Sequence, residues 1–346
     1  MKFLMGHEKD FWSFVDSIKK EDNVAIVSHN DLDGLASAFF MEKILYFKKI
    51  KPRIIEIIDY GDLENCFDKC KKGGVNKILL SDIYADGRDN IDFLIKAFKD
   101  FDMFMIDHHP INPKIKDIKN VIKTETPFCA SFIIYNLAKH YFDPSESDWL
   151  LEAALVADRS YFAKEILKFL QKKHPSITEE NIINSIPGEL MQTIGAAIIY
   201  YSDDLKKVYA LLKEKNIASM EKARKEIDKE FKKWTDKFKK NAEFYGDKKM
   251  YFFYGAPKFG ITSAICTTLS IENPGNLIVF VSDSQREPGK CKVSARSQSG
   301  EVDVNLLLKK SVNGLEGAMA GGHKKAAGGS FLKKDLEKFK KNLVKN

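Results

Sequence analysis

Short apolar segments alternate with segments of helical spacing over the first third of this 346-residue chain. The apolar segments are rich in β-branched and aromatic residues and have the length of buried strands; they cover 24–28, 53–58, 77–81 and 101–106. Between them, apolar residues recur with helical spacing over 35–47, 62–71 and 91–98. The alternation predicts an α/β fold with a parallel sheet that is covered by helices on both faces.

Acidic and histidine-bearing clusters stand where four apolar segments end. They are His29-Asn30-Asp31-Leu32-Asp33-Gly34, Ser81-Asp82, Asp107-His108-His109-Pro110 and Ala157-Asp158-Arg159. Ligands of open parallel sheets bind beyond the carboxyl ends of the strands, so we expect the first three clusters at one edge. Asp158 follows 149–157, whose spacing is helical. Because desolvated carboxylates need a compensating cation, we interpret the clusters as one metal site.

The residue types in these clusters fit divalent metal chemistry. Oxygen and imidazole ligands suit Mn²⁺ or Mg²⁺, and no cysteine stands beside the clusters to form a thiolate zinc site. Two such ions about 3.5–4 Å apart bind the attacking and leaving oxygens of an in-line phosphoryl displacement and lower the pKa of a bound water. Taken singly, the segment 31–34 also fits a surface turn, and Asp82 or Asp158 also fits a cap. The ordered set therefore carries the prediction.

A second signature lies near the C-terminus. It is Gly321-Gly322-His323-Lys324-Lys325-Ala326-Ala327-Gly328-Gly329, preceded by Arg296 in the segment 292–297. Glycines let a backbone approach a phosphate closely, and an arginine binds phosphate oxygens in bidentate fashion. Standing alone, the run also fits a flexible loop. It is not a P-loop, because no Gly-Lys-Ser/Thr ends it.

Together these motifs resemble the DHH phosphoesterase superfamily, which includes RecJ-type exonucleases and nano-RNases. His29-x-Asp31-x-Asp33-Gly34, Asp82, Asp107-His108-His109 and Asp158 are similar to its four metal motifs in order, and Gly321-Gly322-His323-x-x-Ala326-Ala327-Gly328 is similar to the loop of the DHH-associated domain. The similarity runs from about His29 to Phe331. It implies an N-terminal parallel-sheet DHH domain, a helical connector and a smaller C-terminal α/β domain, with the active site in the cleft between the domains.

The resemblance also implies roles for individual residues. It implies two Mn²⁺ ions, with Mg²⁺ as the alternative, and Asp82 as the ligand that they share. One ion takes Asp31 and His29, and the other takes Asp33, His108 and Asp158. Asp82, His108 and His109 are the implied catalytic residues, and the implied substrate-binding residues are His109, Arg296, Gly321, Gly322 and His323. The single Asn30 between His29 and Asp31 is a shorter spacing than in many relatives.

We expect the DHH domain at 1–202, the connector at 203–246 and the DHH-associated domain at 247–346. In the connector, Ile227, Phe231, Trp234 and Phe238 form a helical seam, and lysines cover much of the remaining surface. This pattern fits a solvated helix, and it also fits a basic flank that holds a nucleic-acid backbone. The formal net charge of +7 favours a polyanionic partner.

Composition predicts a cytoplasmic protein without a membrane partner. The five cysteines are scattered and form no C-x-x-C pair, which predicts a reducing compartment. No apolar run has the length needed to cross a bilayer, and the first residues lack a signal-peptide profile.

We expect a metal-dependent phosphodiesterase that acts as a RecJ-like exonuclease on single-stranded DNA or RNA. Two alternatives stay open: a nano-RNase or cyclic-dinucleotide phosphodiesterase that acts on short oligonucleotides, and a replication-complex scaffold. Docking to replication or repair proteins and a homo-oligomer also stay open.

Overall fold

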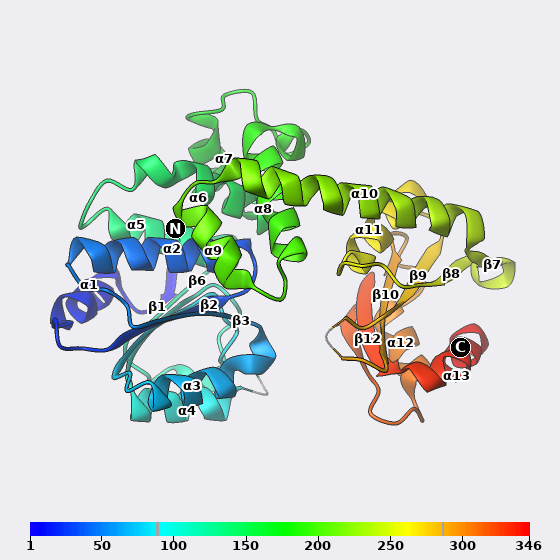
Figure 1. Ribbon diagram of the computed structural model, residues 1–346, viewed down its shortest axis with the longest axis horizontal. Helices are drawn as coiled ribbons and strands as arrows, with labels where there is room; N and C mark the ends of the chain where they lie inside the picture. The colour runs from blue at the N-terminus through cyan, green and yellow to red at the C-terminus, as the bar shows by residue number, and fades with distance from the viewer. Residues whose placement is uncertain (88–89, 286) are drawn as a thin grey trace. The chain divides into compact units, whose positions relative to one another are not determined.

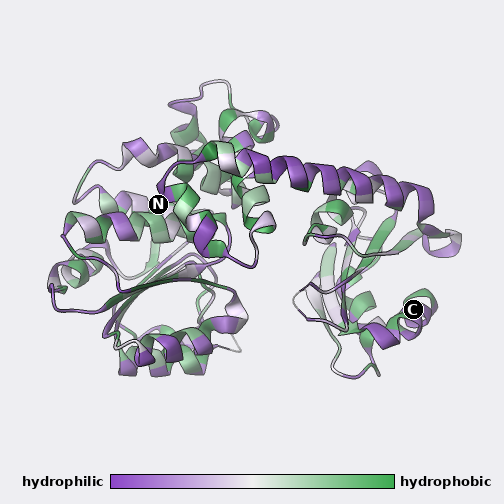
Figure 2. Ribbon diagram, in the orientation of Figure 1, coloured by the Kyte–Doolittle hydropathy of each residue, from purple (hydrophilic) through white to green (hydrophobic). Residues whose placement is uncertain are grey.

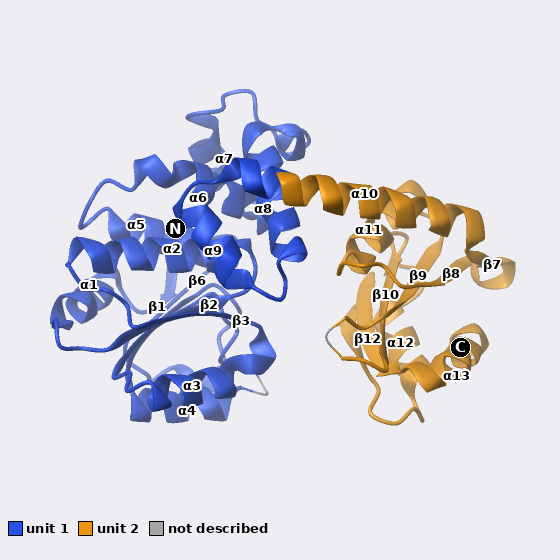
Figure 3. Ribbon diagram, viewed as in Figure 1, with its two compact units in different colours: residues 1–221 blue, residues 222–346 orange. Residues whose placement is uncertain are grey.

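The computed structural model describes residues 1–87, 90–285 and 287–346. It contains two compact units, Met1–Glu221 and Lys222–Asn346, each with its own sheet (Figure 3). The division between the units falls within the long helix α10 (Ile217–Asn241). The expected connector, 203–246, also holds α9 (Leu205–Lys213) and β7 (Glu243–Tyr245).

A six-stranded sheet forms the centre of the first unit, in the order β1-β6-β5-β4-β2-β3. Strands β2 to β6 are parallel, and β1 pairs antiparallel with β6 at one edge. The strands are β1 (Phe3–Met5), β2 (Val24–His29), β3 (Ile54–Ile58), β4 (Lys77–Ser81), β5 (Asp102–Asp107) and β6 (Val121–Thr124). The four strands predicted from the sequence are confirmed as β2 to β5, and β1 and β6 are additional.

The order of strands places a topological switch point beside β2. From β2 the chain moves to β3 on one side, then crosses to β4 on the other side and continues to β5 and β6. Ser28, one residue before the end of β2, is in register with Ser81 at the end of β4, and their hydroxyl oxygens are 2.9 Å apart. Ligands bind at such switch points, so the residues that follow β2 and β4 stand where the topology favours a site.

Helices cover both faces of this sheet (Figure 1). Helices α3 and α4 lie on one face, and α2 and α5 lie on the other. Helix α2 is buried over most of its length because it packs against β2, α5 and α6. The helices of this unit before α9 are α1 (Glu8–Ser17), α2 (Leu32–Phe47), α3 (Leu63–Lys72), α4 (Ile91–Asp100), α5 (Ala130–Ala138), α6 (Asp148–Ala157), α7 (Lys164–Gln171) and α8 (Ile186–Tyr200).

The second unit has a mixed six-stranded sheet in the order β11-β12-β10-β9-β8-β7. Strands β8 and β9 are parallel, and the other neighbouring pairs are antiparallel. The remaining elements are β8 (Met250–Gly255), α11 (Thr262–Glu272), β9 (Leu277–Asp283), β10 (Lys290–Ser297), α12 (Val304–Val312), β11 (Met319–His323), β12 (Ala326–Leu332) and α13 (Leu336–Lys345). The prediction of a smaller α/β domain is thereby confirmed.

The apolar seam of α10 contributes to the core of the second unit. Trp234 and Phe238 are buried, and their rings lie 6.4 Å and 6.1 Å from the ring of Phe280 in β9. Most of the other residues of this helix are hydrophilic (Figure 2), and its charges partly pair within the helix, as Lys233 does with Glu230 at 2.9 Å. In the described part of the chain, no helix is both long and apolar enough to span a membrane.

Candidate metal centre

The turn after β2 carries the first cluster into the first turn of α2. Asp31 caps this helix, because its Oδ1 accepts a hydrogen bond from the backbone N–H of Gly34 at 2.9 Å. Gly34 packs so closely on the end of β2 that a Cβ there would lie 2.2 Å from the carbonyl oxygen of His29. The glycine of the motif is therefore required by this close approach of two backbone segments.

Asp82 follows β4 in a strained backbone conformation. Its φ is 55°, in the left-handed region, which costs a non-glycine residue about 1–3 kcal/mol. A hydrogen bond of 3.0 Å from its N–H to the carbonyl oxygen of Ile106 holds this conformation. The side chain is 2% exposed, and its Oδ2 has no hydrogen-bond partner. Strain and an unpaired buried oxygen in one residue are typical of a functional position.

Asp82 belongs to a first group of donors with His29 and Asp31. The Nδ1 atom of His29 lies 3.0 Å from Oδ2 of Asp31 and 3.9 Å from Oδ2 of Asp82. This nitrogen is buried and makes no hydrogen bond. Burial lowers the pKa of His29, but the carboxylates, chiefly Asp31, outweigh burial and raise it above its ordinary value. The donor atoms of the three residues lie within 4.8 Å of one another, a spacing that one metal ion can bridge.

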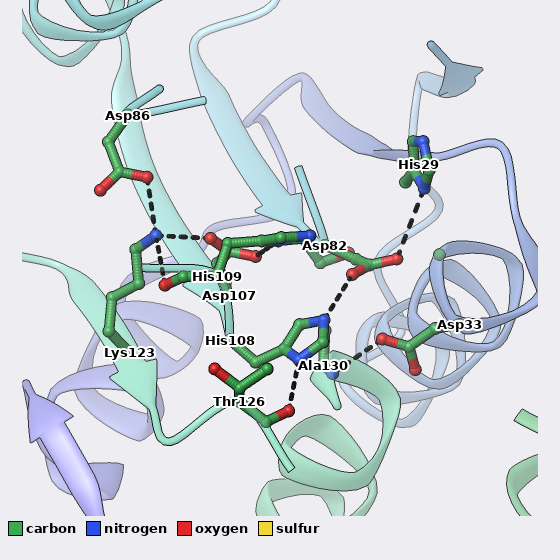
Figure 4. Close-up of polar contacts among 12 residues, drawn as sticks. His29, Asp33, Asp82, Asp86, Asp107, His108, His109, Lys123, Thr126 and Ala130 are labelled. Carbon is green, nitrogen blue, oxygen red and sulfur yellow. Dashed lines mark hydrogen bonds and ion pairs between the residues drawn. The ribbon is translucent and has the colours of Figure 1, made fainter. Parts of the chain in front are cut away.

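Asp82 also belongs to a second group, with the two histidines that follow β5. Its Oδ1 lies 3.4 Å from Nε2 of His108 (Figure 4). The other ring nitrogen of His108 donates a hydrogen bond of 2.9 Å to the carbonyl oxygen of Thr126. This bond sets the tautomer and leaves the lone pair of Nε2 directed at the site, an arrangement typical of metal-binding histidines. The donor atoms of Asp82, His108 and His109 lie within 4.8 Å of one another.

The two remaining carboxylates reach the site from helix ends. Asp33 accepts hydrogen bonds from the backbone N–H groups of Ala130 and Ser131, at 2.8 Å and 3.0 Å, and so joins α2 to the N-terminus of α5. Its oxygens keep further lone pairs for a cation. Asp158 ends α6, and its Oδ2 lies 3.7 Å from Nδ1 of His108. Burial, and next the charge of Asp33, raises the pKa of Asp158 to about 7.

His109 is held in a different way from His108. Its Nδ1 donates a hydrogen bond of 2.7 Å to Asp107, and its Nε2 lies 3.3 Å from the hydroxyl of Tyr60. Tyr84 stacks on its ring with centroids 5.6 Å apart. Since both ring nitrogens have protein partners, His109 suits a role beside a bound phosphate better than a role as a metal ligand. Tyr60 and Tyr84 carry no motif that would have revealed their roles in the sequence.

The charges of the centre fit a pair of divalent ions. Within the described ranges, no lysine or arginine pairs with the carboxylates of Asp31, Asp33, Asp82 or Asp158. Burial, and next the charges of Asp33 and Asp31, raises the pKa of Asp82 well above its ordinary value. Four carboxylates balance the four positive charges of two divalent cations, and His29 Nδ1 and Asp82 Oδ2, which make no hydrogen bond, are available as ligands.

The glycine-rich segment of the second unit forms a hairpin. Our interpretation of 321–329 as a loop is wrong: Gly321, Gly322 and His323 lie in the exposed edge strand β11, which pairs with β12. Gly322 has a φ of 142°, and a Cβ there would lie 2.5 Å from the carbonyl oxygen of Ala326. Ala326 is paired with both His323 and Arg296, so the three residues form one row across the sheet.

Arg296 is half-buried in this row. Its guanidinium donates hydrogen bonds to the hydroxyl of Ser263 at 2.8 Å and to the carbonyl oxygen of Ala327 at 3.2 Å. These bonds hold the guanidinium of Arg296 in place. Paired residues of neighbouring strands project from the same face of a sheet, so Arg296 and His323 lie on one face. The row brings together a cation, an imidazole and exposed glycine backbone, which is a combination that suits phosphate binding.

Two family models match the chain. The DHH family N-terminal domain matches residues 23–158, and the DHHA1 domain matches residues 251–345. These two matches together show that the chain belongs to the DHH phosphoesterase superfamily. No curated protein matches the chain in a sequence comparison.

Solved structures with the same fold differ widely in sequence. RecJ of Thermus thermophilus in complex with Mn²⁺ has a TM-score of 0.67 at 14% identity, over 98% of this chain and 54% of RecJ. CDC45 of Entamoeba histolytica has a TM-score of 0.64 at 10% identity, over 98% of both chains. An exopolyphosphatase-related protein of Bacteroides fragilis has a TM-score of 0.53 at 16% identity, over 100% of this chain and 98% of that one. The chain thus spans about half the length of RecJ and nearly the full length of the other two.

Proposed function

We propose that this protein is a metal-dependent phosphodiesterase that acts as a RecJ-like exonuclease on single-stranded DNA or RNA. The observation that carries the proposal is that Asp82 belongs to two donor groups at once, one with His29 and Asp31 and one with His108 and His109. Such a shared carboxylate is what a two-metal centre needs. When bound, two Mn²⁺ ions, or Mg²⁺ ions as the alternative, neutralise charge on a phosphate and lower the pKa of a water molecule.

The proposed roles of the side chains are metal binding and substrate binding. The proposed ligands of one ion are His29, Asp31 and Asp82, and those of the other are Asp33, Asp82, His108 and Asp158. With a proton on each ring nitrogen, His109 donates a hydrogen bond from Nε2 to a phosphate oxygen, and Asp107, which accepts a hydrogen bond from Nδ1, keeps the ring in place for this contact. In the second unit, Arg296, His323 and the exposed backbone of Gly321 and Gly322 bind the terminal nucleotide through its phosphate.

Three further observations support the proposed metals, a nucleic-acid substrate and a cytoplasmic location. RecJ has been solved with both Mn²⁺ and Mg²⁺, and its fold resembles this one. The formal net charge of +7 favours a polyanion. All five cysteines are buried and unpaired, which fits the reducing conditions of the cytoplasm.

The second candidate function is hydrolysis of short oligonucleotides. It is favoured by the alignment over nearly the full length of a compact exopolyphosphatase-related protein, whereas RecJ is about twice as long as the matched part. A nano-RNase or cyclic-dinucleotide phosphodiesterase would use the same ligands. The likeness to CDC45 favours docking to replication or repair proteins, but the presence of every acidic motif residue in the sequence argues against a scaffold without catalysis.

A time course with Mn²⁺ on end-labelled single strands separates these functions. The strands are DNA and RNA of about five and thirty nucleotides, and the Asp82→Asn variant is the control. The proposal predicts a ladder on the long strands that the variant does not produce. Cleavage confined to the short strands would move the assignment to oligonucleotide turnover, and no cleavage of any strand would refute the proposed enzyme.

A further inference from the structure

Lys123 is a buried cation close to the metal centre that none of the motifs includes. It lies in β6 with no exposed side-chain surface, in register with Asp107 of β5. Its Nζ donates hydrogen bonds to Oδ2 of Asp107 at 2.5 Å, to Oδ1 of Asp86 at 2.7 Å and to the carbonyl oxygen of His109 at 3.3 Å (Figure 4). The ammonium thus has three oxygen partners, which is what its full burial requires.

Asp86 is itself fixed, so it anchors the lysine. Its Oδ2 accepts a hydrogen bond of 2.8 Å from the backbone N–H of Asn112, and its carbonyl oxygen accepts one of 2.9 Å from the Asn112 side chain. Asp86 follows β4, and Asn112 follows β5. The lysine therefore stands where the loop after β4, the loop after β5 and strand β6 are tied together.

The two oxygens of Asp107 divide its contacts between the lysine and the site. Lys123 donates to Oδ2, and the Nδ1–H of His109 donates to Oδ1 at 2.7 Å. The carboxylate cannot rotate without losing one of these charge-assisted bonds. A continuous series of hydrogen bonds therefore runs from Asp86 through Lys123 and Asp107 to His109. It ends at the imidazole that the proposed function places beside the phosphate.

We propose that Lys123 is a positioning residue for His109: by fixing Asp107, it sets the orientation of the ring and holds a proton on Nδ1, so that Nε2 faces the substrate. The proposal rests on the proposed function for what His109 does, but its structural part stands alone. Neither Asp86 nor Asp107, the two carboxylates that Lys123 binds, belongs to a donor group around Asp82. Loss of the lysine should therefore leave metal binding intact and reduce turnover.

Stability alone does not explain such a cluster. Replacing a buried ion pair by apolar or neutral residues of similar size is often neutral or stabilising, whereas removing a single partner is strongly destabilising. Asp86, Lys123 and Asp107 together carry one negative charge when all are ionised. The double variant Asp86→Asn/Lys123→Met removes the clamp and keeps that net charge, so it tests positioning without a change in the total charge of the cluster.

The kinetic test compares this double variant with wild type and with Lys77→Met. Lys77 is also largely buried and pairs with Asp102, but it lies at the opposite end of its strand β4 from Asp82. For the double variant we expect kcat to fall about 10- to 100-fold, as for partners that orient a functional histidine, with KM and the Mn²⁺ dissociation constant within about threefold. Lys77→Met should lose stability and keep kcat. A double variant with wild-type kcat would overturn the proposal.

The second readout is the ¹⁵N NMR spectrum of protein labelled at its seven histidines, recorded with diamagnetic Mg²⁺. Wild type should carry the proton of His109 on Nδ1, and the double variant should show a mixture of tautomers. This readout needs no turnover, so it decides the proposal even if the protein cleaves no phosphodiester. If the double variant does not fold, wild type still decides: an unprotonated Nδ1 on His109 would refute the inference, and a protonated one would support it.

Discussion

Neutralising Asp82 should stabilise the metal-free protein while it destroys the metal site. The side chain is 2% exposed, its Oδ2 has no hydrogen-bond partner, and burial together with neighbouring carboxylates raises its pKa well above the ordinary 3.8. An unpaired buried polar group costs about 1–3 kcal/mol. Asp82→Asn removes the charge at nearly constant volume, so we expect a gain of that size at pH 8. In a domain of this size each kcal/mol shifts the Tm by about 2–4 °C, which gives a rise of roughly 2–12 °C.

The pH dependence gives the sign of this effect. The folded protein keeps the Asp82 proton to a higher pH than the unfolded chain does. Between the two pKa values the unfolded chain binds fewer protons, so the stability of metal-free wild type falls as the pH rises through that window. Below about pH 4 the group is protonated in both states. The advantage of Asp82→Asn should therefore be large at pH 8 and smaller at pH 5.

The assay is thermal unfolding of EDTA-treated protein at both pH values, repeated with Mn²⁺. Asp148→Asn is the matched control, because Asp148 is also buried but accepts a hydrogen bond from Tyr135 and pairs with Lys173, so its loss should cost about 1–3 kcal/mol. Mn²⁺ at 100 times its dissociation constant should stabilise wild type by about 2.7 kcal/mol and leave Asp82→Asn unchanged. If Asp82→Asn destabilises the metal-free protein as Asp148→Asn does, the reasoning about unpaired charge is wrong.

Three further perturbations test other parts of the centre. Gly34→Ala puts a Cβ 2.2 Å from the carbonyl oxygen of His29, so it should lower the free energy of unfolding in urea by at least about 1–3 kcal/mol. The control Gly195→Ala, whose Cβ would meet no atom within 4 Å, should be neutral or stabilising, and equal effects of the two changes would contradict the close packing. Arg296→Ala should raise KM at least about tenfold and leave Mn²⁺ binding unchanged, and Lys292→Ala, at an exposed position, is the control. Loss of Mn²⁺ binding with an unchanged KM would show that Arg296 does not bind the substrate. Mn²⁺ should bind more tightly as the pH rises from 6 to 8, because Asp158, with a pKa raised to about 7 by burial and by Asp33, must lose its proton; calorimetry that finds no change would contradict this.

The strands that lie in the middle of the first sheet were predictable because burial on both faces leaves a plain sequence signal. Strands β2, β4 and β5 are almost entirely buried, and their sequences are correspondingly apolar. Strand β6 escaped prediction because it has four residues and carries the polar Thr124 and Lys123, and the burial of Lys123 depends on a distant partner, Asp86. The hairpin β11-β12 escaped because glycines are depleted in strands and favour turns.

The acidic and histidine residues of the centre were predictable as candidates because of their place after the strands. The contacts that bring these residues together were not predictable from the sequence. The left-handed φ of Asp82 depends on its hydrogen bond with Ile106, and the orientation of Asp33 depends on amides about a hundred residues away, in α5. Periodicity and spacing carry no information about such long-range contacts, so the positions of Tyr60 and Lys123 beside the site came only from the structure.

The most direct test of the shared-carboxylate centre is anomalous diffraction from crystals soaked in Mn²⁺. The data are measured at a wavelength where manganese scatters anomalously. The account predicts two anomalous peaks, one beside His29 and Asp31 and the other beside His108, with the carboxylate of Asp82 touching both. A single peak, or two peaks of which one has no contact with Asp82, would contradict the shared-carboxylate centre.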